Sequence, residues 1–217
     1  MSRILLVSNA HHDNQTEYLN SWFEKVVEVA KKQSDIKILE LKKEEANKKN
    51  LVEMIEKENP QSIIFNGHGS DDSIAGFNKE ILVRCEDNES ILSGKIIHSM
   101  ACRSANILGK RCITLGTKCF IGYKEDFELW SMRQKDKKDQ LQDQMAGLFL
   151  EPAYEAIIAL VEGNNTGEAY RRSQDIYKEN ILALVTSKNT HHNTVVAKSL
   201  FNNFQNQVCL GDKTVSF

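Results

Sequence analysis

Short, continuously apolar runs alternate with segments of helical periodicity along the first half of this chain. The runs are predicted strands, at residues 3–8, 36–41, 63–66, 96–100 and 119–123. Strands that are apolar throughout and separated by helices form parallel sheets with helices on both faces. The sequence therefore predicts an α/β fold, a three-layer α/β/α sandwich with a mainly parallel sheet.

Helices are predicted between these strands and over most of the last third. The predicted helices are residues 15–33, 44–58, 104–115, a helix that closes at Gly163, and a further one capped by Asn165. Residues 73–77 indicate a short hairpin, a polar segment follows as far as Gly94, and residues 208–210 are a predicted terminal strand. No Gly/Ser-rich or Pro-rich linker interrupts the chain, so residues 1–217 are expected to form a single domain.

Charge and hydropathy narrow the class of protein. The formal net charge of −2 argues against a dedicated nucleic-acid binder, because phosphate contacts need an excess of Lys and Arg. The apolar residues after Met1 are too few for the core of a signal peptide, and no apolar run approaches the roughly 20 residues that span a bilayer. We therefore expect neither a nucleic-acid nor a membrane partner.

The cysteines indicate a reducing compartment. They are Cys85, Cys102, Cys112, Cys119 and Cys209. An odd number without a paired framework suits the cytoplasm, and their irregular spacing matches no zinc pattern. The pairs His11-His12 and His191-His192 could bind metal, but adjacent histidines on loops are usually solvated. We expect no metal and no cofactor, and His98, inside a strand, is expected to be a hydrogen-bonded core residue.

Two of the predicted strands end in residues that could perform chemistry. The third strand leads into His68-Gly69, and the fourth leads into Ala101-Cys102. Because the carboxyl ends of parallel strands meet at one edge of the sheet, His68 and Cys102 are expected to lie together there. A neighbouring imidazole and the N-terminus of the predicted helix after Cys102 would both favour a reactive thiolate. The backbone N–H groups of Gly69 and Cys102 could form an oxyanion hole.

Three segments resemble the caspase-like cysteine peptidases, which include caspases, metacaspases, gingipains, legumains and the bacterial CHAT domains. The segments are Phe-Asn-Gly-His-Gly-Ser at residues 65–70, Met-Ala-Cys-Arg-Ser at 100–104, and Leu-Gly-Thr-Lys-Cys-Phe-Ile-Gly-Tyr at 115–123. The resemblance implies a caspase-like sheet, with His68 as the general acid and base and Cys102 as the nucleophile. The connection between these two residues is shorter than in caspases.

The resemblance implies a cysteine endopeptidase that cleaves a specific protein substrate, with bacterial defence or regulated proteolysis as its setting and a regulatory protein as a further partner. Two alternatives remain: a catalytically inactive interaction module on the same fold, and a nucleotide-binding domain. The second lacks a glycine-rich phosphate motif after any strand.

Substrate-binding residues are expected in the loop after the first strand and the segment after the fifth. These supply Asp13 and the pair Glu125-Asp126, whose carboxylates would select Arg or Lys at P1. Met100 would instead shape an apolar pocket, and Lys124 an acidic preference. Residues 131–140 are polar and charged and lie where caspases carry a processed linker, but a solvated loop or helix start is the favoured interpretation, because charge runs usually mark exposed surface.

Overall fold

Six strands form the central sheet in the order β2-β1-β3-β7-β8-β9, in a computed structural model that describes residues 2–133, 136–187 and 191–217. The first five strands in this order run parallel, and β9 is antiparallel to β8. Their bounds are β1 (Arg3–Asn9), β2 (Ile36–Lys42), β3 (Ser62–Asn66), β7 (Ile96–Ser99), β8 (Cys119–Tyr123) and β9 (Gln207–Gly211). The predicted strands are confirmed to within one or two residues at each end.

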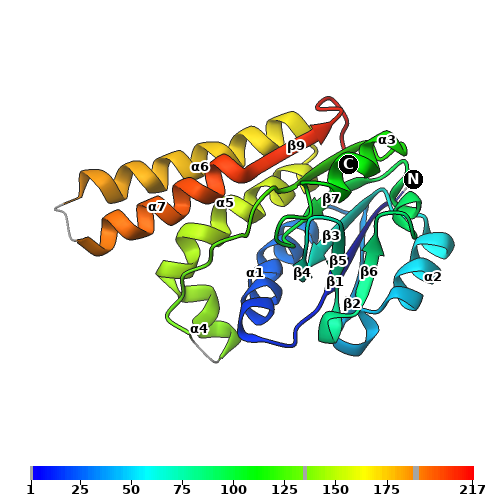
Figure 1. Cartoon of the computed structure of the whole chain (residues 1–217), viewed down its shortest axis with the longest axis horizontal. Coiled ribbons are helices and arrows are strands. Elements are labelled where there is room, and N and C mark those ends of the chain that lie inside the picture. Colours follow the sequence, from blue (N-terminus) through cyan, green and yellow to red (C-terminus); the bar gives the residue numbers. More distant parts are fainter. Residues whose placement is uncertain (1, 134–135, 188–190) are drawn as a thin grey trace.

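Helices cover both faces of this sheet (Figure 1). They are α1 (Asn14–Ala30), α2 (Lys48–Glu58), α3 (Leu108–Thr114), α4 (Lys137–Gln142), α5 (Gln144–Val161), α6 (Thr166–Thr186) and α7 (His191–Asn206). Short 3-10 turns are η1 (Lys43–Glu45), η2 (Phe77–Lys79) and η3 (Glu89–Leu92). Helices α1 and α5–α7 lie on one face, and α2 and α3 on the other. The fold is a three-layer α/β/α sandwich, as the sequence predicts.

Alternation along each strand divides the hydrophobic core in two. Leu5 and Val7 of β1 face the helices α1 and α5, whereas Leu6 between them belongs to the cluster beneath α2 and α3. In β8, Ile121 and Phe120 divide in the same way. Because successive side chains of a strand point to opposite faces, a continuously apolar strand is buried on both sides.

Helix α5 is the most apolar of the described helices. Among the described residues, it is the one segment long and apolar enough to cross a membrane, but 67% of its length is buried inside the protein. It packs against α1 and α6, and the chain continues through Pro152 without ending the helix. This burial identifies it as a core helix of the fold.

A small antiparallel sheet lies beside the carboxyl edge of the central sheet. It consists of β4 (His68–Gly69), β5 (Ser73–Ala75) and β6 (Ile81–Arg84). The predicted hairpin at 73–77 corresponds to its middle, whereas β6 lies in a segment for which the sequence predicts no strand. The small sheet fixes the backbone of His68 and Gly69 through their pairing with Ala75 and Ile74.

The helix predicted at residues 104–115 is present as α3, but its predicted start is wrong. Residues 101–107 form turns, and α3 begins only at Leu108. Arg103 has a φ of 57°, which is left-handed and outside a helix, and the Ser104 hydroxyl donates to the Ala101 carbonyl at 2.8 Å. Cys102 is therefore followed by turns and not, as expected, directly by the N-terminus of a helix.

Candidate functional site

Four consecutive strands of the sheet deliver the candidate site. Strands β1, β3, β7 and β8 are parallel neighbours, so the segments that follow them emerge at one edge. In the order of the strands, these segments carry Asp13, His68, Cys102 and Phe127. The site thus occupies the sheet edge that the sequence predicts.

Gly69 brings the segment after β3 against the segment after β7. A Cβ atom at Gly69 would lie 2.7 Å from the Cys102 carbonyl oxygen and 2.8 Å from the Ala101 Cβ. Both distances are too short for a side chain, so only glycine permits this close approach. The backbone beside His68 is therefore packed directly on the backbone of Cys102.

His68 is oriented by a carboxylate. Its Nε2 donates to Oδ2 of Asp13 at 2.5 Å, and no hydrogen bond to its Nδ1 occurs among the residues that the structure describes. Asp13 is also the N-cap of α1, where its Oδ1 accepts the Thr16 N–H at 2.9 Å. Burial acts to raise the pKa of Asp13, but the hydrogen bonds from Thr16 and His68 outweigh it and bring the pKa to about 2. Asp13 is thus an anion that fixes the orientation of the imidazole through its Nε2–H.

A buried polar network fixes the strand ends beneath this pair. Asn66, the last residue of β3, donates through Nδ2 to Oδ1 of Asn9 at 2.7 Å. The Tyr154 hydroxyl donates to the Asn66 Oδ1 at 3.1 Å and to the Leu19 carbonyl at 2.7 Å. Buried networks whose groups are all paired make a backbone rigid, so the loops that carry Asp13 and His68 start from fixed positions.

The Cys102 thiol is half-buried beneath the segment that follows β8. Its Sγ accepts the Phe127 N–H at 3.4 Å, and the Arg103 N–H next to it donates to the Glu125 carbonyl at 3.1 Å. Burial raises the pKa of the Cys102 thiol, although the Phe127 N–H acts in the opposite direction. No hydrogen bond joins Cys102 to His68 in the described part of the chain. The free protein therefore carries a protonated thiol at neutral pH.

One of the left-handed residues of the chain, Arg103, lies directly after this cysteine. The left-handed φ of 57° at Arg103 is uncommon for a residue other than glycine and costs on the order of 1 kcal/mol. The turn is stabilised by a hydrogen bond of 2.8 Å between the hydroxyls of Ser99 and Ser104, both buried. The same backbone conformation occurs outside the site, for example at Asn59 and Glu86, so it shapes the turn after the cysteine without marking it as functional.

The four predicted substrate-binding residues occupy different environments. Asp13 is engaged with His68 and Thr16, so its carboxylate does not form the base of a pocket. Met100 is 1% exposed and lies in the core. Glu125 is exposed, and Asp126 forms an exposed ion pair of 3.1 Å with Nε of Arg103. None of these placements supports the expected selection of Arg or Lys at P1.

A hollow of about 240 Å³ lies between the start of α1 and the segment after β8. These are the two segments in which the sequence analysis expects substrate-binding residues. Its described lining consists of uncharged residues: Asn14, Gln15, Phe127, Leu129 and Ser131. Phe127 connects it to the site, because its N–H contacts the Cys102 thiol.

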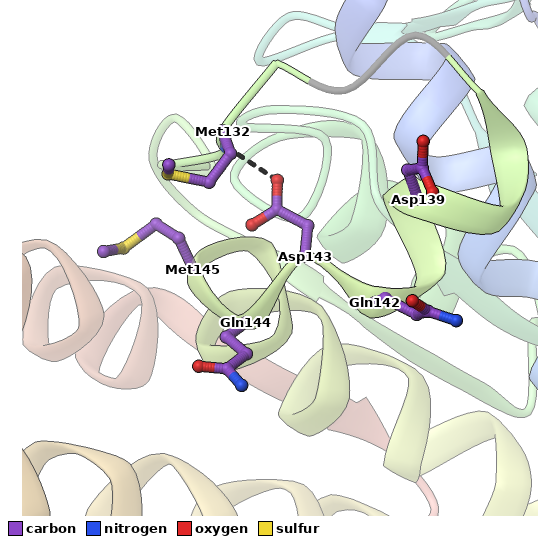
Figure 2. Close-up of a pocket in the computed structure, with 6 residues that line it drawn as sticks. All are labelled: Met132, Asp139, Gln142, Asp143, Gln144 and Met145. Carbon is purple, nitrogen blue, oxygen red and sulfur yellow. Dashed lines mark hydrogen bonds between the residues drawn. The ribbon is translucent and has the colours of Figure 1, made fainter.

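A second hollow, of about 450 Å³, lies between Met132 and the junction of α4 and α5 (Figure 2). The Asp143 carboxylate in it already accepts hydrogen bonds from the Met132 N–H, the Tyr18 hydroxyl and the Ala146 N–H. This hollow has no His or Cys among its described lining residues, and its carboxylate has a structural role. The segment predicted as a processed linker lies nearby: its residues 134 and 135 are outside the described residues, and residues 137–140 begin α4.

His12 lies in a different environment from the solvated loop expected for the His11-His12 pair. Its side chain is 11% exposed rather than solvated, and its ring lies edge-on to that of His68, with centroids 5.3 Å apart. The sequence of two adjacent histidines does not show whether their side chains are solvated or buried. His98 is buried in β7, as expected, but the expectation that its ring is satisfied is wrong, because neither ring nitrogen has a hydrogen-bond partner among the described residues.

Comparison with known proteins adds no family assignment. No protein-family model matches the chain, and no curated protein matches it. The class that the fold and the site define is thus an α/β sandwich with a histidine, a carboxylate and a cysteine at the carboxyl edge of its parallel strands. These groups can exchange protons and supply a nucleophile.

Proposed function

We propose that this chain is a cysteine endopeptidase, similar to the caspase-like peptidases, in which Cys102 attacks a peptide carbonyl. The observation that carries the proposal is the close approach of Gly69 to the Cys102 carbonyl, which packs the backbone next to His68 against the backbone of Cys102. A nucleophile, a base, and a third group that orients the base are the arrangement that covalent catalysis requires.

The reaction follows from the roles of the three side chains. Asp13 binds the Nε2–H of His68, which leaves Nδ1 to take the thiol proton as Sγ of Cys102 bonds to the carbonyl carbon. The resulting imidazolium, stabilised by the Asp13 carboxylate, gives this proton to the leaving amine as the C–N bond breaks. Water, deprotonated by His68, then hydrolyses the thioester and restores the thiol.

Backbone N–H groups stabilise the charge that develops on the carbonyl oxygen. The Cys102 N–H donates to no other residue in the described part of the chain, so it is suited to bind an oxyanion, together with the Gly69 N–H. Because burial raises the pKa of the Cys102 thiol, its proton moves to His68 during the attack and not before the substrate binds.

The substrate is a specific protein or peptide, and the setting is a cytoplasmic system of bacterial defence or regulated proteolysis with a regulatory protein partner. All five cysteines are free thiols, which is compatible with a reducing cytoplasm. The partly open hollow beside Phe127 has room for one substrate side chain.

The alternative is a catalytically inactive interaction module on the same fold. The burial of the Cys102 thiol and its contact with the Phe127 N–H favour it, because a thiol in this state attacks slowly until the contact opens. This alternative predicts a folded protein that binds a partner protein and cleaves nothing.

A peptide-library digest read by mass spectrometry tests the proposal. Wild type and Cys85→Ala should give the same cleavage products, because Cys85 is a half-buried cysteine outside the site. Cys102→Ala and His68→Ala should give none, with circular dichroism spectra like that of the wild type. Equal cleavage by Cys102→Ala would contradict the proposal, and a folded wild type without any cleavage would favour the interaction module.

A further inference from the structure

We infer that His12, Asp13 and His68 form a binding site for Zn²⁺, through which the metal inhibits the proposed peptidase. Each residue offers one ligand atom, and these atoms all lie within 4.8 Å of one another. Two imidazole nitrogens and a carboxylate oxygen are ligands that Zn²⁺ commonly takes, with a water molecule in the fourth position.

The spacing of the ligand atoms suits a tetrahedral ion. Nε2 of His12 lies 3.6 Å from Oδ2 of Asp13, and ligands at about 2.0–2.1 Å from Zn²⁺ are about 3.3 Å apart in a tetrahedron. Nε2 of His68 lies 2.5 Å from the same oxygen, which is a hydrogen-bond distance. Replacing the shared proton with Zn²⁺ would lengthen this contact by less than an ångström, a change that rotation of the half-exposed Asp13 and His68 side chains can supply.

The state of His12 is an independent sign of a ligand. Both ring nitrogens of His12 are buried and have no hydrogen-bond partner in the described part of the chain. The ring packs edge-on against those of His68 and Phe77, with centroids 5.3 and 5.9 Å away. A buried polar ring without hydrogen-bond partners costs stability and calls for an explanation such as a bound ion. A bond from Nε2 of His12 to Zn²⁺ supplies one.

Inhibition rests on the proposed function, whereas binding does not. When Zn²⁺ binds Nε2 of His68, it displaces the proton that this nitrogen shares with Asp13, and the neutral imidazole then carries its single N–H proton on Nδ1. The ring can then no longer take the thiol proton at Nδ1 and become the imidazolium that protonates the leaving amine. A chelator would reverse the inhibition, because no covalent bond within the protein is formed.

Binding is tested by titrating the full chain with Zn²⁺ under reducing conditions, in competition with a chromophoric chelator. His12→Asn should weaken the binding of one Zn²⁺ per chain by more than about tenfold. His12→Phe is a second variant, which keeps a ring packed at this position. The matched control is His11→Asn, since His11 is the adjacent histidine outside the cluster, and it should bind like the wild type.

The five free thiols require their own control, because thiolates also bind zinc. Cys102→Ala should retain the site, and Co²⁺ bound in place of Zn²⁺ should show no thiolate-to-cobalt charge-transfer band from this equivalent. Affinity equal to wild type in both His12 variants, or a site that disappears in Cys102→Ala, would overturn the inference.

Activity provides a separate readout. The Zn²⁺ concentration that halves the cleavage rate should rise more than about tenfold in His12→Asn, with each protein compared with its own rate in chelator. If the wild type cleaves nothing but His12→Asn still loses the bound equivalent, the proposed function fails while the metal site stands. If the wild type cleaves and Zn²⁺ inhibits both proteins equally, the inhibitory site lies elsewhere and the inference fails.

Discussion

The Nε2 of His68 donates a hydrogen bond of 2.5 Å to the carboxylate of Asp13, a residue 55 positions earlier in the chain. This contact joins the segment after β1 to the segment after β3, and it makes Asp13 a positioning residue for the proposed general acid and base. Asp13 simultaneously caps α1, so its two roles must be separated by the choice of substitution.

Asp13→Asn should lower kcat by about a hundredfold or more, because it removes the charge that stabilises a protonated His68. Asparagine caps helices as well as aspartate does, so stability should change little, whereas Asp13→Ala should also lose about 1 kcal/mol from the cap. Steady-state kinetics of Asp13→Asn should show kcat falling with KM almost unchanged. A kcat equal to that of the wild type would remove Asp13 from the mechanism.

Gly69→Ala should disrupt the contact that brings the two strand ends together. Its Cβ would meet the Cys102 carbonyl oxygen at 2.7 Å, and this backbone atom cannot rotate away. We expect a loss of about 1–3 kcal/mol in the free energy of unfolding and, since misplacement of about 1 Å can cost a hundredfold, a large loss of activity.

The control for this change is Gly147→Ala in α5. A Cβ there would lie 3.4 Å from Trp22, an ordinary contact, and the substitution should stabilise the helix by up to about 1 kcal/mol. Denaturant unfolding followed by circular dichroism compares the two variants. If Gly69→Ala is as stable and as active as Gly147→Ala, the close approach has no functional role.

The P1 preference should be for an uncharged side chain, because the described lining of the hollow beside Phe127 carries no charge. Gln15→Glu would place a carboxylate in this lining and should increase cleavage after Lys and Arg. Asp126→Ala should leave the preference unchanged, since Asp126 is exposed and paired with Arg103. Cleavage by the wild type mainly after Arg or Lys, lost in Asp126→Ala, would restore the specificity expected from the sequence.

Stability should decrease in mild acid through His98. Burial lowers the pKa of His98 to about 4, below its ordinary value of about 6.5 in an unfolded chain. The unfolded state therefore binds the proton more readily between these pH values. The contribution of neutral His98 to the free energy of unfolding is complete above about pH 6.5 and falls as the pH approaches 4.

The loss should be on the order of 3 kcal/mol over this range. Chemical denaturation at a series of pH values measures it, with His98→Gln as the comparison because glutamine does not titrate. The difference in the free energy of unfolding between wild type and His98→Gln should shrink or change sign toward pH 4. Parallel pH profiles would show that His98 is not responsible.

The sheet was predictable because its strands are apolar on both faces. Runs such as residues 63–66 and 119–123 cannot be solvated, so their position in a covered parallel sheet follows from the sequence alone. Strand β6 was not predictable, because it has only four residues and pairs with β5, which has three. Helix α7 was also not predicted as a separate helix. It begins with His, Asn and Thr, which have weak helix propensity, and packing against α6 stabilises it.

The site was predictable only in part. The positions of His68 and Cys102 at one sheet edge follow from strand order, but the partner of His68 depends on the path of the loop after β1. Asp13 has the pattern of a helix cap and no local sign of a second role. Residues 104–107 were misassigned to a helix that begins at Leu108. The turn there depends on the hydrogen bond from the Arg103 N–H to the Glu125 carbonyl, which is distant in sequence.

The most direct test of the account is the rate at which a peptide acyloxymethyl ketone labels Cys102, read by intact mass and peptide mapping. We expect one adduct per chain, on Cys102, and its formation should be about a hundredfold slower in His68→Ala than in the wild type. Cys85, whose thiol pKa is also raised by burial, should remain unlabelled and is the internal control. Equal labelling of Cys102 and Cys85, or equal rates in wild type and His68→Ala, would contradict the claim that His68 activates Cys102.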